Sequence, residues 1–181
     1  MKKKYIIYEI TNWSILLILF FILAGQFSSK LYAQNDVEIF PKIRGAIGII
    51  HPIVTFSSEK TTTNFRDYYS VGMTMAINVW KNKKIGYSLE LVPIIKSDDE
   101  ISKVSNVIIH PGILVRLKND FTFIGRVAFE TSGRYGITPI LSKVLYKHKD
   151  TNYAVSLPVA LRFGNNKTAA LTLGLQFAVS F

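Results

Sequence analysis

The sequence predicts an all-β protein that folds as one eight-stranded antiparallel up-and-down barrel. Apolar and polar residues alternate with a period of two in eight successive runs. After residue 33, no stretch shows the three-to-four-residue spacing of an amphipathic helix. The chain has 181 residues, of which 49% are apolar, and this combination suits a single folded domain rather than two domains or a disordered chain.

The first 33 residues are predicted to be a cleaved signal peptide. Lysines at 2–4 precede an apolar run at 15–25. As a helix, that run would rise about 16 Å, roughly half the thickness of the hydrocarbon core of a bilayer. This length is typical of a signal peptide, and we expect cleavage between Ala33 and Gln34. The alternative is an uncleaved anchor extended backwards through Trp13, which the polar residues before that tryptophan disfavour.

Residues 34–181 would then form the mature barrel domain. The chain's formal net charge of +10 falls to +7 on cleavage, because four lysines and one glutamate leave with the signal peptide. Export excludes nucleic acid as the partner that this basic charge would otherwise suggest. The absence of cysteine excludes a disulfide framework, a thiolate metal site and a cysteine nucleophile.

The last predicted strand carries the strongest alternation, with seven apolar residues on one face from Ala169 to Phe181. The first strand contains His51-Pro52, which predicts either a break or a bulge there. The sixth is the weakest, because Lys143 falls on its apolar face. Either the ammonium reaches out of that face or the register is off by one. The eight predicted strands cover residues 42–56, 69–79, 85–91, 107–117, 121–130, 135–146, 153–163 and 169–181.

The polar face of these strands is predicted to line the barrel interior. It consists mostly of Gly, Ala, Ser and Thr, which suit the narrow lumen of eight strands, whereas most lysines fall in the turns. Arginine and glutamate side chains can pair inside such a lumen and plug it against bulk solute flow. The predicted polar network of the lumen comprises Arg44, Glu90, His110, Arg116, Arg126, Glu130 and Arg162.

The apolar face is predicted to contact lipid. Its aromatic residues gather near the two ends of the strands, while Val, Leu, Ile, Met and Ala occupy the middle. Two aromatic girdles around an aliphatic belt are typical of a transmembrane β-barrel. The alternative turns the apolar face inward and gives an exported, soluble, lipocalin-like calyx that binds an apolar ligand.

The terminal strand and the segment at 31–34 carry a family resemblance. The chain resembles the small outer-membrane β-barrels of Gram-negative bacteria, and more narrowly the eight-stranded barrels of Bacteroidetes-type organisms, over residues 42–181. Phe177, Val179 and Phe181 resemble the C-terminal signal that the barrel-assembly machinery reads. The resemblance implies Sec-dependent export, location in the cell outer membrane, and outer-membrane lipid and the assembly machinery as partners.

No motif predicts a catalytic, cofactor-binding or metal site. A zinc site needs three or four converging ligands, and the three histidines, at 51, 110 and 148, have no such spacing. Ser142 or Ser156 could lie near His110 or His148 in a lipid-modifying enzyme, but no motif links them.

Function is therefore assigned to the connections between strands. The long connections at 57–68 and 96–102 are the candidates for outward recognition. We expect a non-enzymatic outer-membrane barrel that acts in envelope integrity, adhesion or small-ligand interaction. A lipid-modifying outer-membrane enzyme and the soluble calyx are the alternatives, and the sequence does not name a partner for the loops.

Overall fold

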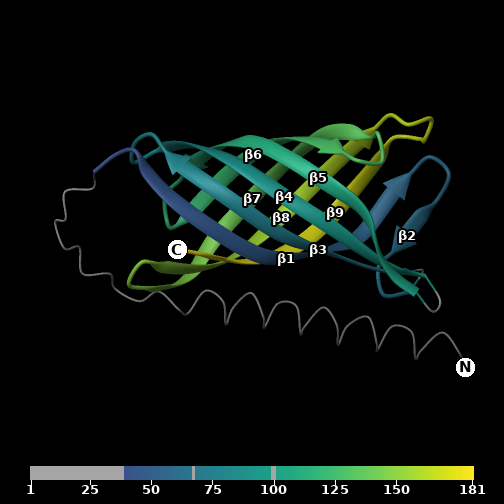
Figure 1. The fold of residues 1–181 in the computed structure, drawn as a ribbon, viewed down its shortest axis with the longest axis horizontal. Helices are drawn as coiled ribbons and strands as arrows, with labels where there is room; N and C mark the ends of the chain where they lie inside the picture. The colour runs from purple at the N-terminus through teal and green to yellow at the C-terminus, as the bar shows by residue number, and fades with distance from the viewer. Residues whose placement is uncertain (1–38, 67, 99–100) are drawn as a thin grey trace, which may run out of the picture. The chain divides into compact units, whose positions relative to one another are not determined.

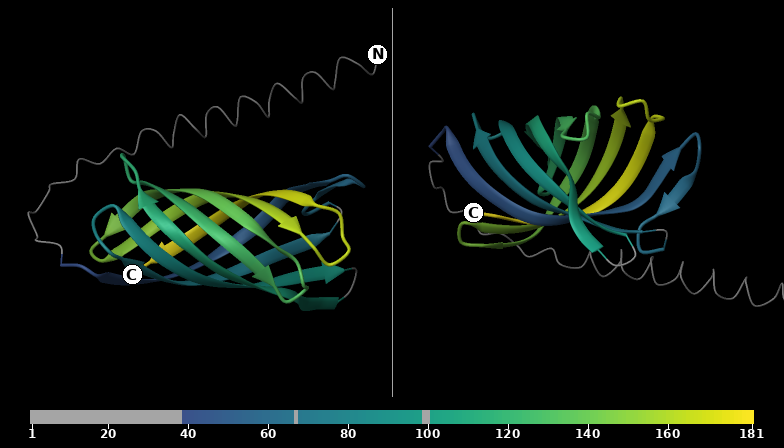
Figure 2. Two further views of the ribbon diagram at one scale, coloured as in Figure 1. Left: turned by 90° about the horizontal axis from the view of Figure 1, so that it is seen from above. Right: turned by 45° about the vertical axis from the view of Figure 1, so that its right-hand side comes forward.

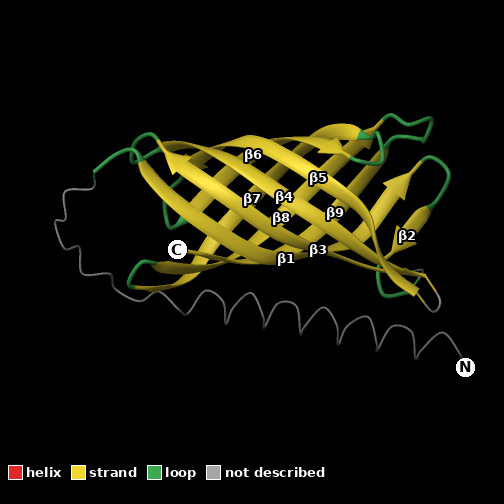
Figure 3. Cartoon of the chain, viewed as in Figure 1, coloured by secondary structure: helices red, strands yellow, loops and turns green. Residues whose placement is uncertain are grey.

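The computed structural model describes residues 39–66, 68–98 and 101–181 (Figure 1). The predicted signal peptide and its cleavage site at Ala33 and Gln34 lie outside these residues. The described part contains strands, turns and loops and no helix (Figure 3), so it holds no apolar helix that could span a bilayer. Its strands are β1 (Lys42–Ser57), β2 (Thr61–Thr63), β3 (Tyr69–Trp80), β4 (Ile85–Asp98), β5 (Ile101–Arg116), β6 (Phe121–Glu130), β7 (Tyr135–His148), β8 (Thr151–Phe163) and β9 (Ala170–Ser180).

Eight of these strands form a closed antiparallel barrel, which confirms the predicted fold. The sheet runs in the order β1-β3-β4-β5-β6-β7-β8-β9, each strand beside its neighbour in the chain, and β9 pairs back to β1 (Figure 2). Closure leaves no free edge along the wall. We call the end with the start of β1 and the turns 81–84, 117–120 and 149–150 the termini end. The opposite end, with the connections 58–68, 131–134 and 164–169, is the loop end.

The sequence allowed two interpretations for the first and the sixth predicted strands, and the structure shows both strands to be continuous. The register of β1 against β9 shifts between Pro52 and Val54, so the strand is bulged there and not broken. Lys143 keeps the predicted register, because it pairs with Phe121 and Val155 on the outward face. Its ammonium reaches the termini end, where Nζ donates to the carbonyl oxygen of Asn119 at 3.1 Å.

The two long connections contain more strand than the sequence predicts. The segment 96–102 is mostly strand, since β4 and β5 stay paired from Ile94 out to Asp98↔Ile101. Within 57–68, β2 pairs with the part of β1 that extends beyond its last partner on β3. The Asn64 side chain then joins β3, donating to the carbonyl of Ser70 and accepting from its N–H, both at 2.8 Å. This connection therefore completes the barrel wall at the loop end.

The outward face is apolar along the whole wall, as predicted for a lipid-facing surface. Ile47, Met75 and Leu157 are each about half exposed. The interior is less polar than the lumen that the sequence predicts. Towards the loop end it contains a buried apolar cluster of Val92, Ile108 and Ala128.

Candidate functional site

A buried carboxylate lies at the centre of the barrel interior. Glu90 projects inward from β4 and forms an ion pair with Arg126 of β6, with Nη1 2.5 Å from Oε2. Each of these two side chains is only 4% exposed. Glu90 is also within hydrogen-bond distance of His110 Nδ1 at 3.2 Å and accepts from Gln176 Nε2 at 3.4 Å. Four strands are thus tied together through one carboxylate.

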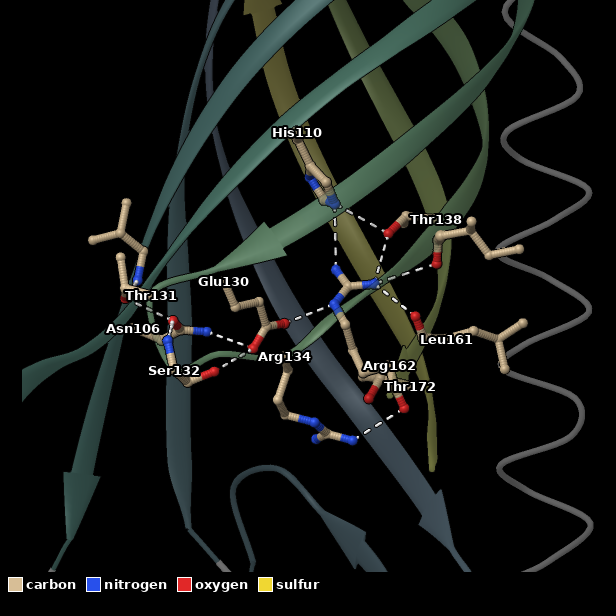
Figure 4. Close-up of polar contacts among 12 residues, drawn as sticks. Asn106, His110, Glu130, Thr131, Ser132, Arg134, Thr138, Leu161, Arg162 and Thr172 are labelled. Carbon is tan, nitrogen blue, oxygen red and sulfur yellow. Dashed lines mark hydrogen bonds and ion pairs between the residues drawn. The ribbon is translucent and has the colours of Figure 1, made fainter. Parts of the chain in front are cut away.

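A second ion pair lies on the loop side of the first. Arg162 of β8 donates through Nε to Glu130 Oε1 at 2.7 Å and through Nη1 to Thr138 Oγ1 at 3.0 Å (Figure 4). Its Nη2 lies 3.3 Å from His110 Nε2. A guanidinium can only donate, so His110 Nε2 accepts and Nδ1 is left to donate to Glu90. His110 therefore connects the two ion pairs.

These side chains form one polar cross-link through the bore, which we call the central plug. It joins β4 to β9, and Gln176 extends it to Thr74 of β3 at 3.2 Å. Each buried charge of the plug has a counter-charge, which is the condition for burying it, although Arg126 Nε has no hydrogen-bond acceptor among the described residues. The plug consists of Glu90, His110, Arg126, Glu130, Thr138, Arg162 and Gln176.

The structure places two predicted lumen residues elsewhere in the interior. Arg44 contacts the backbone oxygen of Asp150 at the termini end. The Arg116 guanidinium lies over the ring of Trp80, 4.0 Å from its centroid, and donates to the Lys83 carbonyl at 3.3 Å. The seven predicted residues therefore do not form one network.

Sequence reasoning missed the uncharged members of the plug. Thr138 and Gln176 occupy alternate, inward-facing positions of their strands, as the charged residues of the plug do. That position in the alternation could have identified them as residues of the interior.

Two cavities lie in the bore of the described part of the chain. A termini chamber of about 440 Å³ is lined by polar and basic side chains, including Arg44, Lys147 and Lys149. A loop chamber of about 270 Å³ opens towards the opposite end. Glu90 and Gln176 line both chambers, so the central plug lies between them.

The loop chamber has mostly apolar walls. Residues of β1 and of β4 to β9 line it, and Arg134, also on the lining, lies in the connection just before β7. The charged floor is made by the plug residues Glu90, Glu130 and Arg162. The apolar walls are formed by Ile50, Val92, Ile94, Ile108 and Ile140.

The serine and histidine residues considered for catalysis do not meet in a triad-like contact. Ser156 Oγ donates to Ser142 Oγ at 2.9 Å, and both line the termini chamber. His110 lines the loop chamber, and His148 stacks on Tyr146. Among the described residues, no group of three or more His, Asp or Glu side chains could hold a metal ion.

The C-terminal residues predicted as an assembly signal lie at the seam that closes the barrel. Phe177 and Val179 of β9 pair with Ile49 and Ile47 of β1. The backbone N–H and carbonyl of Phe181 exchange hydrogen bonds with Gly45 at 3.0 and 2.9 Å.

No protein-family model and no curated protein sequence matches the chain. Among solved structures, it is similar to the crystal structure of the outer membrane protein OprG from Pseudomonas aeruginosa. The two share 10% sequence identity with a TM-score of 0.32, over 75% of this chain and 93% of that one. Function is therefore inferred from the geometry of this barrel.

Proposed function

We propose that this protein is an outer-membrane barrel of a Gram-negative bacterium that is closed to bulk solute flow and acts through its loop end. In this proposal the chain is exported by Sec, and the barrel-assembly machinery reads the seam residues Phe177, Val179 and Phe181. Its role is interaction at the cell surface or with a small ligand, without catalysis.

The observation that carries the proposal is the distribution of side chains between the two faces of the wall. Large aliphatic residues such as Ile47, Leu89 and Leu157 are about half exposed on the outward face, while ion pairs are buried inside. A monomer in water rarely exposes a continuous apolar surface of more than a few hundred Å². In lipid the same surface is favourable, and the closed strand ladder satisfies the backbone. This arrangement favours a membrane barrel over the soluble calyx.

The central plug supports a closed bore. Its two ion pairs, Glu90–Arg126 and Glu130–Arg162, are held by cross-strand hydrogen bonds where the termini chamber and the loop chamber meet. The loop end is the better candidate for recognition, because it carries β2 and the extended β4–β5 hairpin, whereas the termini end has short turns. The bonding of Ser156 to Ser142, rather than to a histidine, supports a non-enzymatic role.

The proposal is tested with the full-length chain expressed in a Gram-negative host. We expect it in the outer-membrane fraction, with faster gel migration before boiling than after. In a planar bilayer the purified barrel should show no conductance of porin size. Recovery in the soluble periplasmic fraction would contradict the membrane assignment, and a porin-sized conductance would contradict the closed bore.

A paired-variant comparison tests whether the plug is what closes the bore. Changing Glu90 and Arg126 together to alanine should raise the conductance. The matched change of Asp120 and Lys147, an ion pair near the termini end with side chains 41% and 34% exposed, should leave it low. Equal conductance of the two double variants would show that the plug does not block ions.

A further inference from the structure

We infer that the loop chamber binds a small amphiphile with a single negative charge, its apolar part inside the barrel and its anionic group on Arg134. This inference rests on the proposed function, because the chamber meets the outside only if the barrel is inserted in the membrane with its loop end facing outward. It adds a ligand class and a site to that proposal.

The walls of the chamber select an apolar group. Ile50, Val92, Ile94, Ile108 and Ile140 come from four strands and face the same space. These five side chains offer a ligand no hydrogen-bond partner, whereas Thr55, Asn106 and Thr172 place a few polar groups on the same lining. The volume of about 270 Å³ lies just below the usual range for small-molecule pockets, which favours a small ligand such as one with a single medium-length chain.

The charged side chains around the chamber have a net charge of one positive unit. Glu90 is paired with Arg126, and Glu130 is paired with Arg162 at 2.7 Å. Counting His110 as neutral, the remaining charged residue on the lining is Arg134. No carboxylate of the described residues lies within ion-pair distance of Arg134.

The hydrogen bonds of Arg134 are also incomplete. Its Nη2 donates to the backbone oxygens of Arg162 and Thr168, both at 3.0 Å. Its Nε is buried and has no acceptor within the described part of the chain. A buried donor without an acceptor is costly, so a ligand oxygen that accepts from this N–H would gain from the contact.

Position and charge together define the ligand class. Arg134 lies at the loop end, beside Arg162 and Glu130 (Figure 4), whereas the apolar residues belong to the strands within. A carboxylate suits the planar fork of an arginine, and one net positive charge favours a monoanion over a dianion. A medium-chain carboxylic acid has this combination of one anionic head and a flexible apolar tail.

The test uses the full-length protein in nanodiscs of phosphatidylcholine and radiolabelled decanoate as the probe. Binding to empty nanodiscs is subtracted, and decanol and decyltrimethylammonium serve as neutral and cationic probes of the same chain length. We expect saturable decanoate binding at one site per barrel, weaker decanol binding, and no saturable binding of the cation.

Three variants assign the site. Arg134→Gln should weaken decanoate binding about tenfold while changing decanol binding little, because only the charge-assisted contact is lost. Lys103→Gln is the matched control, since Lys103 is an exposed cation on β5 at the same end and does not line the chamber. Ala160→Phe fills the chamber and should weaken both decanoate and decanol. Heat-modifiable mobility shows that each variant is folded.

The inference is overturned if decanoate shows no saturable binding above empty nanodiscs, or if Arg134→Gln and Lys103→Gln behave alike. Binding of the cationic probe as tightly as decanoate would also overturn it. Fractionation and conductance of the same preparation separate the two proposals. A closed outer-membrane barrel that ignores decanoate refutes the ligand site alone, whereas a protein that fails fractionation refutes the proposed function.

Discussion

Removal of the Glu90 carboxylate should destabilise the barrel strongly, because it leaves the buried Arg126 cation without its counter-charge. The two side chains are each 4% exposed, and Glu90 also binds His110 and Gln176. Removing one partner of a buried ion pair typically costs about 3–5 kcal/mol of the free energy of unfolding. We expect Glu90→Gln, which keeps the side-chain size and one acceptor oxygen, to lie near the lower end, at about 3 kcal/mol.

The measurement is urea unfolding of the barrel refolded into lipid vesicles, followed by tryptophan fluorescence and gel mobility. Asp120→Asn is the exposed control, because the Asp120–Lys147 pair has side chains 41% and 34% exposed. Exposed pairs contribute about 0.2–1 kcal/mol. Combining Glu90→Gln with Arg126→Met removes both charges and should recover most of the lost stability. A loss no larger than that of Asp120→Asn, or a double variant no more stable than Glu90→Gln, would refute the reasoning.

The other predictions concern the wall and its closure. Gly136→Ala should lower the yield of folded barrel, because an added Cβ would overlap a carbonyl oxygen of β8. Gly125→Ala should be tolerated, since the nearest neighbours of its added Cβ lie at 3.7 Å. Refolding yields measured on gels compare the two variants. Leu141→Lys puts a charge in the middle of the lipid face and should cost about 2–4 kcal/mol in vesicle unfolding, while Lys143→Leu should not destabilise. Deleting Phe181 should reduce the amount of protein in the outer membrane, measured by fractionation, and an unchanged amount would contradict its role as an assembly signal.

The barrel fold could be predicted because one face of each strand meets the same apolar surroundings over most of its length. The run predicted at 169–181 corresponds to β9, Ala170–Ser180, and its outward residues are apolar without interruption. Lys143 disturbed the sixth run, yet its ammonium leaves the apolar face for the carbonyl of Asn119. A single charge whose ammonium reaches polar groups at the barrel end therefore does not overturn a register that the other outward residues of the strand support.

The ends of the strands could not be predicted from the same signal. Beyond Ile94 and Ile95, β4 and β5 continue as a hairpin whose residues include Lys96, Ser97 and Lys103. Where the side chains no longer alternate between apolar and polar, the period-two pattern disappears, although the backbone ladder persists. Hydrogen bonding extends these strands, and composition alone predicts a loop there.

Strand parity predicted which side chains face inward, but not which of them meet. Contacts across the bore depend on the height of each residue in the barrel, which the register and tilt of eight strands fix together. Glu90 and Arg126 lie at the same level along the barrel axis, whereas Arg44 and Arg116 lie at the termini end. The residues predicted as one network therefore form the central plug and two separate contacts.

The apolar loop chamber does have a signal in the sequence, and it differs from the signal for the wall. Residues 91–95 and 107–109 are apolar on both parities, so the inward positions Val92 and Ile108 are apolar where lipid contact does not require it. Packing explains part of this, because Val92, Ile108 and Ala128 form a buried cluster. Packing does not explain why the same walls still enclose about 270 Å³ beside an arginine that lacks a carboxylate partner among the described residues. An open space with apolar walls beside such a cation is what a site for an anionic amphiphile requires.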